Sequence, residues 1–402
     1  MCSRLRLSLG VLMLLALSLA SAVQAADSPT RKPLTSDERS ALMSLLKAVD
    51  LAQETDIVSD MNLPWETHVL KAGNDVGYVP FRLSLSPLAD AVKSAVMYVR
   101  VVSRHDGYRS TEEDSSIREW VLHGGAFPAR APETMTIGAG EMPIGGPAVS
   151  SGRRSISAPA EASAVLAMQQ RQFEKERAAA EAAKKRAESK ERDLYVFPFE
   201  EYYFFDVKSG VVERAIGVPP GEYDVFIGII DRARAKTSSP TVVRHTINVP
   251  DFWDLELRLS SLMLVTGVRT LPSALAVKDQ VEHPYTFGRA EVTPVSKPIF
   301  TADDVLSVVY QICNYGSPDT DITAEYNFFR TVNGTRTLFN RTLPQQLADS
   351  DLPPPIGWET QGFAMQRVPL HQFPSGEYEL EVVVHDRLTR STAKQTTTFT
   401  VK

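Results

Sequence analysis

Cysteine is almost absent from this chain, which has only Cys2 and Cys313 among its 402 residues. We expect Cys2 to be removed with an N-terminal signal, which leaves Cys313 as the single cysteine of the mature protein. A single cysteine excludes an internal disulfide. Because Cys313 ends an apolar segment over 305–313, we expect it to be a small buried hydrophobic residue in a strand.

The chain also lacks the short motifs that identify common catalytic sites. It has no P-loop, no GxGxxG after a strand, no HExxH and no GxSxG. Its seven histidines are scattered, and no two have the spacing of metal ligands on one predicted element. We therefore expect no cofactor, no metal site and no catalytic residue.

Two His-Asp pairs, His105-Asp106 and His385-Asp386, follow predicted strands. An acid beside a histidine supplies groups for a general base, but an aspartate also begins turns by bonding nearby backbone. We favour the turn. The Asp-x-Asp groups at 319–321 and 349–351 are the best calcium candidates, although calcium needs six or more oxygen ligands.

Charge of one sign is not in large excess. Lysine and arginine number 43 and aspartate and glutamate 49, a net charge of −6, so we expect no nucleic-acid partner. Apolar residues at 43% and charged residues at 23% are ordinary for a globular protein. This composition excludes a mostly disordered, collagen-like or many-span membrane chain. At about 150 residues per domain, the length predicts two or three domains.

The only long hydrophobic run lies at the N-terminus. Residues 1–25 have the pattern of a signal peptide, because Arg4 and Arg6 precede the apolar run 7–20 and small residues around Ala25 form a cleavage site. A membrane anchor is the alternative, but a helical span needs about 20 apolar residues and this run is shorter. We expect cleavage after Ala25, a periplasmic or secreted protein, and no transmembrane span in the mature chain.

Residues 26–62 are expected to form an N-terminal helical segment. Thr35 and Glu38 fit a capping box, and apolar residues then recur at helical spacing, which predicts a helix over 35–53. From about residue 63 the pattern changes to the alternation that is typical of strands.

Two adjacent segments interrupt the strand pattern. Residues 104–160 are rich in glycine and proline, which predicts a long flexible loop. Residues 161–193 are rich in alanine, glutamate, lysine and arginine, with i,i+4 pairs such as Glu181 and Lys185, which predicts a charged helix. Its apolar stripe is thin, so we favour a solvated helix over a coiled coil, which needs apolar residues at both a and d.

Aromatic residues concentrate in one short segment. The candidate binding patch consists of Tyr195, Phe197, Phe199, Tyr202 and Tyr203. An exposed aromatic patch usually marks binding, here of a carbohydrate or peptide. The alternative, which we favour, is that alternate rings fill the core of a sandwich.

The most informative pattern is an internal repeat between 221–232 and 376–387. Each copy begins Gly-Glu-Tyr, continues with alternating apolar residues and ends Asp-Arg. Glycine permits a tight entry, tyrosine buries its ring while its hydroxyl bonds nearby backbone, and aspartate begins the turn. The matching residues are Gly221 and Gly376, Tyr223 and Tyr378, and Asp231 and Asp386.

This repeated unit resembles the last two strands of immunoglobulin-like and fibronectin type III-like β-sandwich modules of exported bacterial proteins. Such sandwiches carry a tyrosine near the start of the penultimate strand. The resemblance implies a mainly β chain with two immunoglobulin-like sandwich domains, 63–250 and 251–402. The loop and the charged helix would then be an insertion in the first domain. Within the second, Asn333-Gly334 is a strong hairpin signal.

Together these features favour a non-catalytic exported protein that acts as a binding or scaffold module of the cell envelope. It would act through sandwich surfaces and the exposed charged helix, and its partner would be an envelope protein or a glycan. The alternative is a carbohydrate-active enzyme or its accessory binding module, because a site can assemble from residues distant in sequence.

Overall fold

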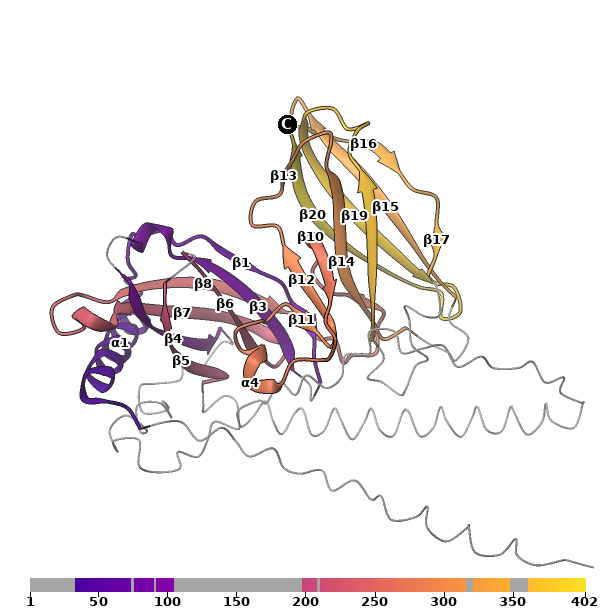
Figure 1. Cartoon of the computed structure of the whole chain (residues 1–402). Coiled ribbons are helices and arrows are strands. Elements are labelled where there is room, and N and C mark those ends of the chain that lie inside the picture. The colour runs from indigo at the N-terminus through magenta and orange to yellow at the C-terminus, as the bar shows by residue number, and fades with distance from the viewer. Residues whose placement is uncertain are drawn as a thin grey trace, which may run out of the picture. The chain divides into compact units, whose positions relative to one another are not determined.

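The computed structural model describes residues 33–73, 76–89, 92–104, 197–207, 210–315, 321–347 and 361–402. This part of the chain is mainly β, as expected, with four sheets and one long helix (Figure 1). The helical elements are α1 (Ser36–Thr55), α4 (Val277–Gln280), η1 (Ser86–Leu88) and η3 (Arg232–Arg234).

The first two sheets form the N-terminal sheet pair. In sheet A, the central strand β3 pairs on one side with β1 and β2 and on the other with β6; in sheet B, the strand order is β5-β4-β7-β8. The bounds are β1 Trp65–Thr67, β2 Leu70–Lys71, β3 Gly77–Ser84, β4 Ser94–Ser103, β5 Phe199–Asp206, β6 Val211–Val218, β7 Gly221–Asp231 and β8 Thr241–Val249.

The other two sheets form the C-terminal sheet pair. Sheet C has the order β11-β12-β10-β14-β18, with β9 also on β14; sheet D has the order β13-β20-β19-β15-β16, with β17 also on β15. The bounds are β9 Arg258–Leu259, β10 Met263–Thr270, β11 Thr286–Phe287, β12 Ala290–Pro294, β13 Ile299–Phe300, β14 Val305–Cys313, β15 Ile322–Val332, β16 Thr335–Arg341, β17 Gln345–Gln346, β18 Gln361–Pro369, β19 Gly376–Asp386 and β20 Ser391–Val401.

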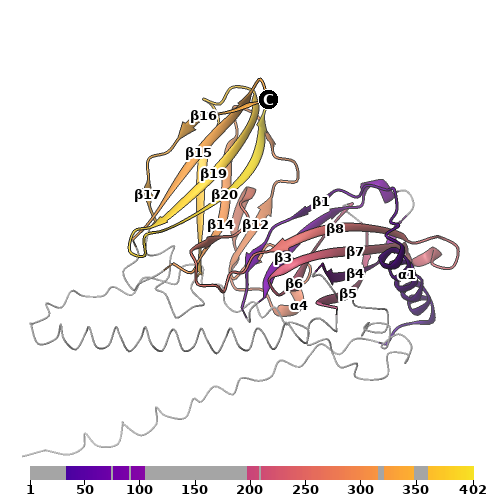
Figure 2. The ribbon, with the colours of Figure 1, turned by 180° about the vertical axis from the view of Figure 1, so that it is seen from behind.

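The two sheet pairs share a strand order. The run β5-β4-β7-β8 of sheet B has the same chain order as β16-β15-β19-β20 of sheet D, whose strands lie side by side in Figure 2. The predicted hairpin between β15 and β16 is confirmed, because Asn333 and Gly334 have φ of 52° and 76° at its turn. A type I′ turn requires both angles to be positive.

Each sheet pair encloses a core of its own. Since successive strand residues point to opposite faces, alternate residues of the central strands enter the core. Fully buried examples are Phe81, Met97 and Ile227 between sheets A and B, and Val308, Leu380 and Val382 between sheets C and D.

Helix α1 covers the outer face of sheet B. Its buried residues, among them Leu45 and Val49, pack against Phe226 and its neighbours. The predicted capping box is present, because the Glu38 amide donates to the Thr35 hydroxyl and the Thr35 amide donates to the Glu38 carboxylate. The amphipathic pattern and the cap together explain why this segment is helical and which side it buries.

A buried arginine fastens α1 to sheet B. Arg100 on β4 is fully buried and donates to Asp50 at 2.7 Å and Gln53 at 3.2 Å, both on α1. Its Nε donates to the Tyr98 hydroxyl at 2.8 Å, and this hydroxyl donates to Glu200 on β5. Burial, with the Glu200 charge second, raises the pKa of Tyr98 well above its usual value. Because a buried charge needs partners, the network favours one placement of the helix.

The two sheet pairs contact each other through the outer faces of sheets A and C. Apolar residues of both, including Leu70 and Met263, form one buried cluster. The Lys71 amide donates to Gln311 Oε1 at 2.7 Å, and Gln311 Nε2 donates back to the Lys71 carbonyl at 3.1 Å. The two sheet pairs thus belong to one compact unit.

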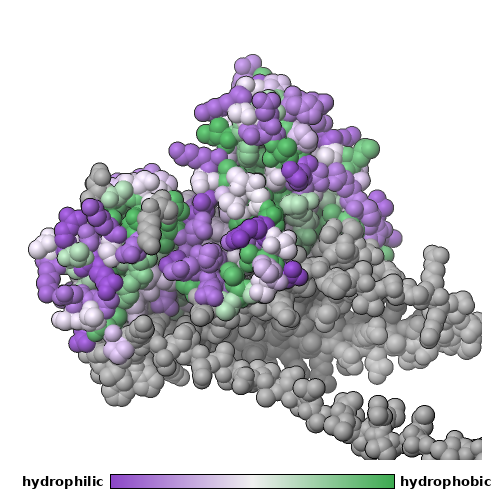
Figure 3. Space-filling view, viewed as in Figure 1, coloured by the Kyte–Doolittle hydropathy of each residue, from purple (hydrophilic) through white to green (hydrophobic). Residues whose placement is uncertain are grey.

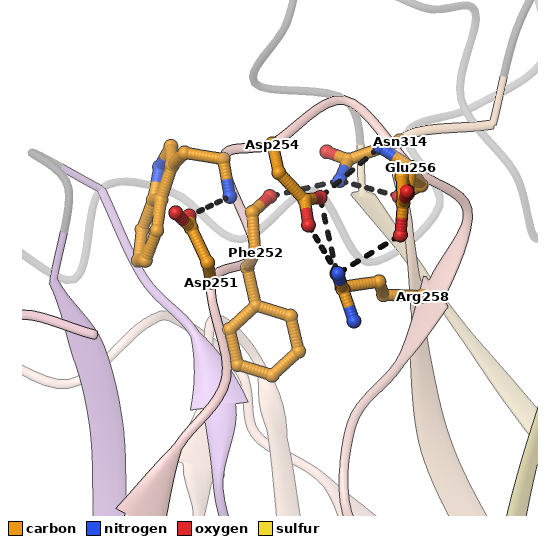
Figure 4. Close-up of polar contacts among 7 residues, drawn as sticks. Asp251, Phe252, Asp254, Glu256, Arg258 and Asn314 are labelled. Carbon is orange, nitrogen blue, oxygen red and sulfur yellow. Dashed lines mark hydrogen bonds and ion pairs between the residues drawn. The ribbon is translucent and has the colours of Figure 1, made fainter. Parts of the chain in front are cut away.

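The linker between β8 and β9 is held by polar contacts with the residue after β14 (Figure 4). Asn314 Nδ2 donates to the carbonyls of Phe252 and Glu256, at 2.8 Å each. Arg258 Nε donates to Asp254 Oδ2 at 2.9 Å, and its Nη2 donates to Glu256 at 3.0 Å. Hydrogen bonding to Asp254 raises the pKa of Arg258. These carboxylates therefore already have a cationic partner.

Several predicted elements lie outside the described residues: the signal peptide 1–25, nearly all of the loop 104–160, and the charged helix 161–193. Arg104, where the loop was expected to begin, instead continues the sheet, because its amide donates to the Glu222 carbonyl at 2.9 Å. Among the helices of the described residues, none is long and apolar enough to cross a membrane.

Candidate functional site

The two Gly-Glu-Tyr segments form the same corner in both sheet pairs. The Tyr223 hydroxyl donates to the Pro219 carbonyl at 2.8 Å, and the Tyr378 hydroxyl donates to the Pro374 carbonyl at 2.7 Å. The glycine two residues before each tyrosine has a φ of 156° in the first copy and 157° in the second. These angles lie in the region where glycine is the residue without strain. Both tyrosine rings are buried.

The aspartate at the end of each segment closes the following turn. Asp231 Oδ1 accepts from the Ala233 amide at 2.9 Å. Asp386 Oδ1 accepts from the Leu388 and Thr389 amides at 3.0 and 3.2 Å. Both aspartates are buried, and their carboxylates hold backbone in place.

Between these shared ends, the residues on the outer face differ. In sheet B they are apolar or lack a side chain, and α1 packs on them. In sheet D the matching residues are mostly polar and half-exposed. At the three matching positions β7 has Phe226, Gly228 and Ile230, and β19 has Glu381, Val383 and His385.

The outer face of sheet D is hollowed beside the turn between β19 and β20. The hollow has a volume of about 420 Å³ and is lined by the ends of β15, β19 and β20 and by Pro344. The His385 ring lies in it, with Nδ1 at 3.0 Å from the Thr392 hydroxyl and Nε2 at 3.7 Å from Glu325. The Thr392 contact is short enough to be a hydrogen bond, and it leaves the other ring nitrogen facing Glu325.

Two arginines from the same turn also line the hollow. Arg387 is 3.9 Å from Asp321, with more than half of its side chain exposed. Arg390 has a φ of 58° and forms no ion pair with any residue that the structure describes. By contrast Arg232, which matches Arg387 in the first copy, is 2.5 Å from Glu38 of α1. The second copy therefore leaves its guanidinium groups more accessible than the first.

The described lining of the hollow has several hydrogen-bond donors and one carboxylate that is not hydrogen-bonded to the turn. Asp386 lines it as well, but its carboxylate accepts from two turn amides. Glu325 is the remaining carboxylate of the lining. Glycoside hydrolysis generally uses a pair of carboxyl groups, and Glu325 is the one carboxylate of the described lining that is not bonded to the turn.

The sheet D face beyond the hollow carries ordered polar groups. Arg336 lies 3.3 Å over the ring of Phe329 and donates to Glu379 at 2.6 Å. Asn327 donates to Glu381 at 3.3 Å. Such contacts hold half-exposed side chains in one arrangement before any ligand binds.

The aromatic residues singled out in the sequence do not share one face. Tyr195 lies outside the described residues. Phe197 is buried, with the Arg100 guanidinium 4.2 Å from its ring centre. Phe199 and Tyr203 pack against the core between sheets A and B, and Tyr202 packs against the cluster under α1. The described rings thus fill two cores on opposite sides of β5.

Cys313 is fully buried, as expected, and burial raises the pKa of its thiol to about 12. Within the described ranges, no three histidine, cysteine, aspartate or glutamate side chains are grouped to hold a metal ion. The His105-Asp106 pair, Asp319 and 349–351 lie outside those ranges.

No family model matches the chain, and no curated protein matches it. Solved structures with partial likeness include three large proteins, and the chain spans a third or less of their length. They are a red sea bream transglutaminase (7% identity, TM-score 0.19, 88% of this chain and 33% of that one), a Bacteroides uniformis β-glucuronidase 2 (8%, 0.21, 81% and 26%) and an E. coli α2-macroglobulin (8%, 0.17, 85% and 17%). With TM-scores of 0.17–0.21, this likeness assigns the chain neither a family nor an activity.

Proposed function

We propose that the chain is a non-catalytic exported protein that acts as a binding or scaffold module of the cell envelope. It would be built from two immunoglobulin-like or fibronectin type III-like domains, and residues 1–25 would be cleaved after Ala25. The observation that carries this proposal is the open outer face of sheet D. The matching face of sheet B is already occupied by α1.

On the side of the molecule that Figure 3 shows, hydrophilic residues interleave with hydrophobic ones. The support for a polar partner comes from the outer face of sheet D. The sheet D face carries half-exposed, mutually bonded polar groups such as Glu379 and Glu381. A face of this kind exchanges its hydrogen bonds with water for hydrogen bonds with a polar partner, which gives specificity more than affinity.

The alternative, a carbohydrate-active enzyme or its accessory binding module, has one supporting observation. The hollow gathers His385 and Glu325, which are groups that general acid–base chemistry uses. Since Asp386 is bonded to the turn, the lining lacks a second available carboxylate among the described residues. The accessory binding module is therefore the form of this alternative that the geometry favours.

The test is crosslinking capture with the mature protein from Ala26 as bait, read out by identifying the captured protein. Thr396 is exposed on β20 beside Glu381, on the face in question. Thr266 is exposed on β10 of sheet C and provides a matched control. An identified envelope protein that is captured by the wild type and Thr266→Arg but lost with Thr396→Arg supports the proposal. Equal capture by both variants moves the binding site away from sheet D.

A further inference from the structure

We propose that the hollow of sheet D binds an acidic sugar residue of a glycan, with its carboxylate on the arginines and its hydroxyls on Glu325 and His385. This inference rests on the proposed binding function and names the ligand class of that face. The volume of about 420 Å³ lies in the range of small-ligand sites, roughly 300–1,000 Å³.

The carboxylate position follows from the guanidinium groups. Arg387 and Arg390 both line the hollow, and an arginine fork matches a carboxylate with two parallel hydrogen bonds. Asp321 is 3.9 Å from Arg387, beyond direct hydrogen-bond distance. A ligand carboxylate therefore gains charge-assisted bonds that the described residues do not already make, above all with Arg390.

The sugar hydroxyls would lie against Glu325, His385 and Thr392, which also line the hollow. Glu325 accepts hydrogen bonds, and the Nε2 of His385 and the Thr392 hydroxyl both donate and accept, depending on the tautomer and rotamer. The Thr392 hydroxyl lies at hydrogen-bond distance from His385, and Glu325 lies near the other ring nitrogen at 3.7 Å, so the three groups face the hollow side by side. Neighbouring hydroxyls on a sugar ring need such alternating partners, whereas a simple anion such as acetate uses only the arginines.

The carboxylates of the hollow also restrict which anion binds. Glu325, Asp321 and Asp386 lie in or beside it, so a single group with two negative charges, such as a phosphate monoester, is repelled more strongly than a carboxylate. Each sugar-acid unit of a glycan carries one negative charge and several hydroxyls, and this combination fits both the arginines and Glu325. The charge pattern thus favours a uronic acid unit over a phosphate group.

The test is calorimetric titration of the folded chain with a tetragalacturonate. The comparison ligands are the same oligosaccharide with reduced carboxyl groups and, separately, acetate. Binding of the acidic oligosaccharide alone is the expected result. Arg390→Asn, which suits the left-handed backbone, should weaken it by about tenfold or more, the worth of one charge-assisted bond. Arg367→Asn, an exposed arginine on β18, should leave it unchanged.

A second readout places the ligand. In spectra of histidine-labelled protein, the His385 resonance should shift with tetragalacturonate in the wild type and in Arg367→Asn. Equal binding of the reduced oligosaccharide, equal binding by Arg390→Asn, or an unmoved His385 resonance overturns the proposal. If the glycan fails but an identified protein is still captured through Thr396, only this inference falls and the binding function stands.

Discussion

A buried histidine between the two sheet pairs makes stability depend on pH. His68 lies between β1 and β2 and is 7% exposed, with Nδ1 at 3.3 Å from the hydroxyl of Tyr285 near β11. Burial, with the Arg82 charge second, lowers the pKa of His68 from 6.5 to about 4. Protonation in the folded state therefore places a charge in a buried site.

The direction and size of the pH effect on stability follow from this pKa difference. As pH falls below about 6.5, the unfolded chain takes up the proton while the folded chain does not, so the free energy of unfolding falls. The loss continues until the folded state also binds the proton near pH 4. Between about pH 7 and pH 4 this single group removes roughly 3 kcal/mol of stability.

Urea unfolding across this pH range measures the effect. Carboxylates that lose their ion pairs also destabilise the fold in acid, so the informative quantity is the difference between the wild type and His68→Gln. We expect the wild type to lose about 3 kcal/mol more than the variant from pH 7 to pH 4. Parallel curves for the two proteins, or a His68 resonance that titrates near pH 6.5, would refute the assignment of this pH dependence to His68.

Three further predictions concern other buried groups. Arg100→Ala should lower the free energy of unfolding in urea by about 3–5 kcal/mol, because it leaves buried carboxylates without a cation. Its control is Arg104→Ala, which should lower it by less than about 1 kcal/mol because half of the Arg104 side chain is exposed. Similar losses for the two variants would contradict the buried network. Gly228→Val should destabilise by about 1–3 kcal/mol, because a Cβ there meets a leucine of α1 at 3.0 Å. Gly267→Val, with no atom within 4 Å of a Cβ, is its control, and equal melting temperatures would show that α1 does not pack on β7. Cys313 should resist thiol reagents at about pH 8 in the native state and react in urea, because burial raises its pKa to about 12; rapid native labelling would contradict its burial.

Local signals in the sequence predicted much of the fold. The capping box at Thr35 and the hairpin at Asn333 depend on neighbouring residues, and both are present. The alternation of apolar and polar residues, which is also a local pattern, correctly predicted a mainly β chain. Element type is decided over a few residues, so a single sequence contains enough information to predict it.

The candidate site depended on pairing between distant strands, which a pattern search does not reveal. Glu325 meets His385 because β15 pairs with β19. The two arginines belong to a turn that looked ordinary. One signal was available: His385 takes the place that Ile230 has in the first copy, which marks a change of the outer face from apolar to polar. Arg100 and Asp50 were also missed, because a lone charge in an apolar strand does not indicate its partner fifty residues away.

The route of the chain between β4 and β5 has a practical consequence. The two strands are hydrogen-bonded neighbours, with Val101 opposite Phe199, yet residues 104–198 separate them in sequence. The chain thus leaves sheet B and re-enters it at adjacent positions. Closing a flexible loop costs only about 0.6 kcal/mol more for each doubling of its length. The stability of sheet B should therefore depend little on the number of residues inserted between β4 and β5. A fluorescent domain or an affinity tag could be placed at this point while both ends of the chain stay free.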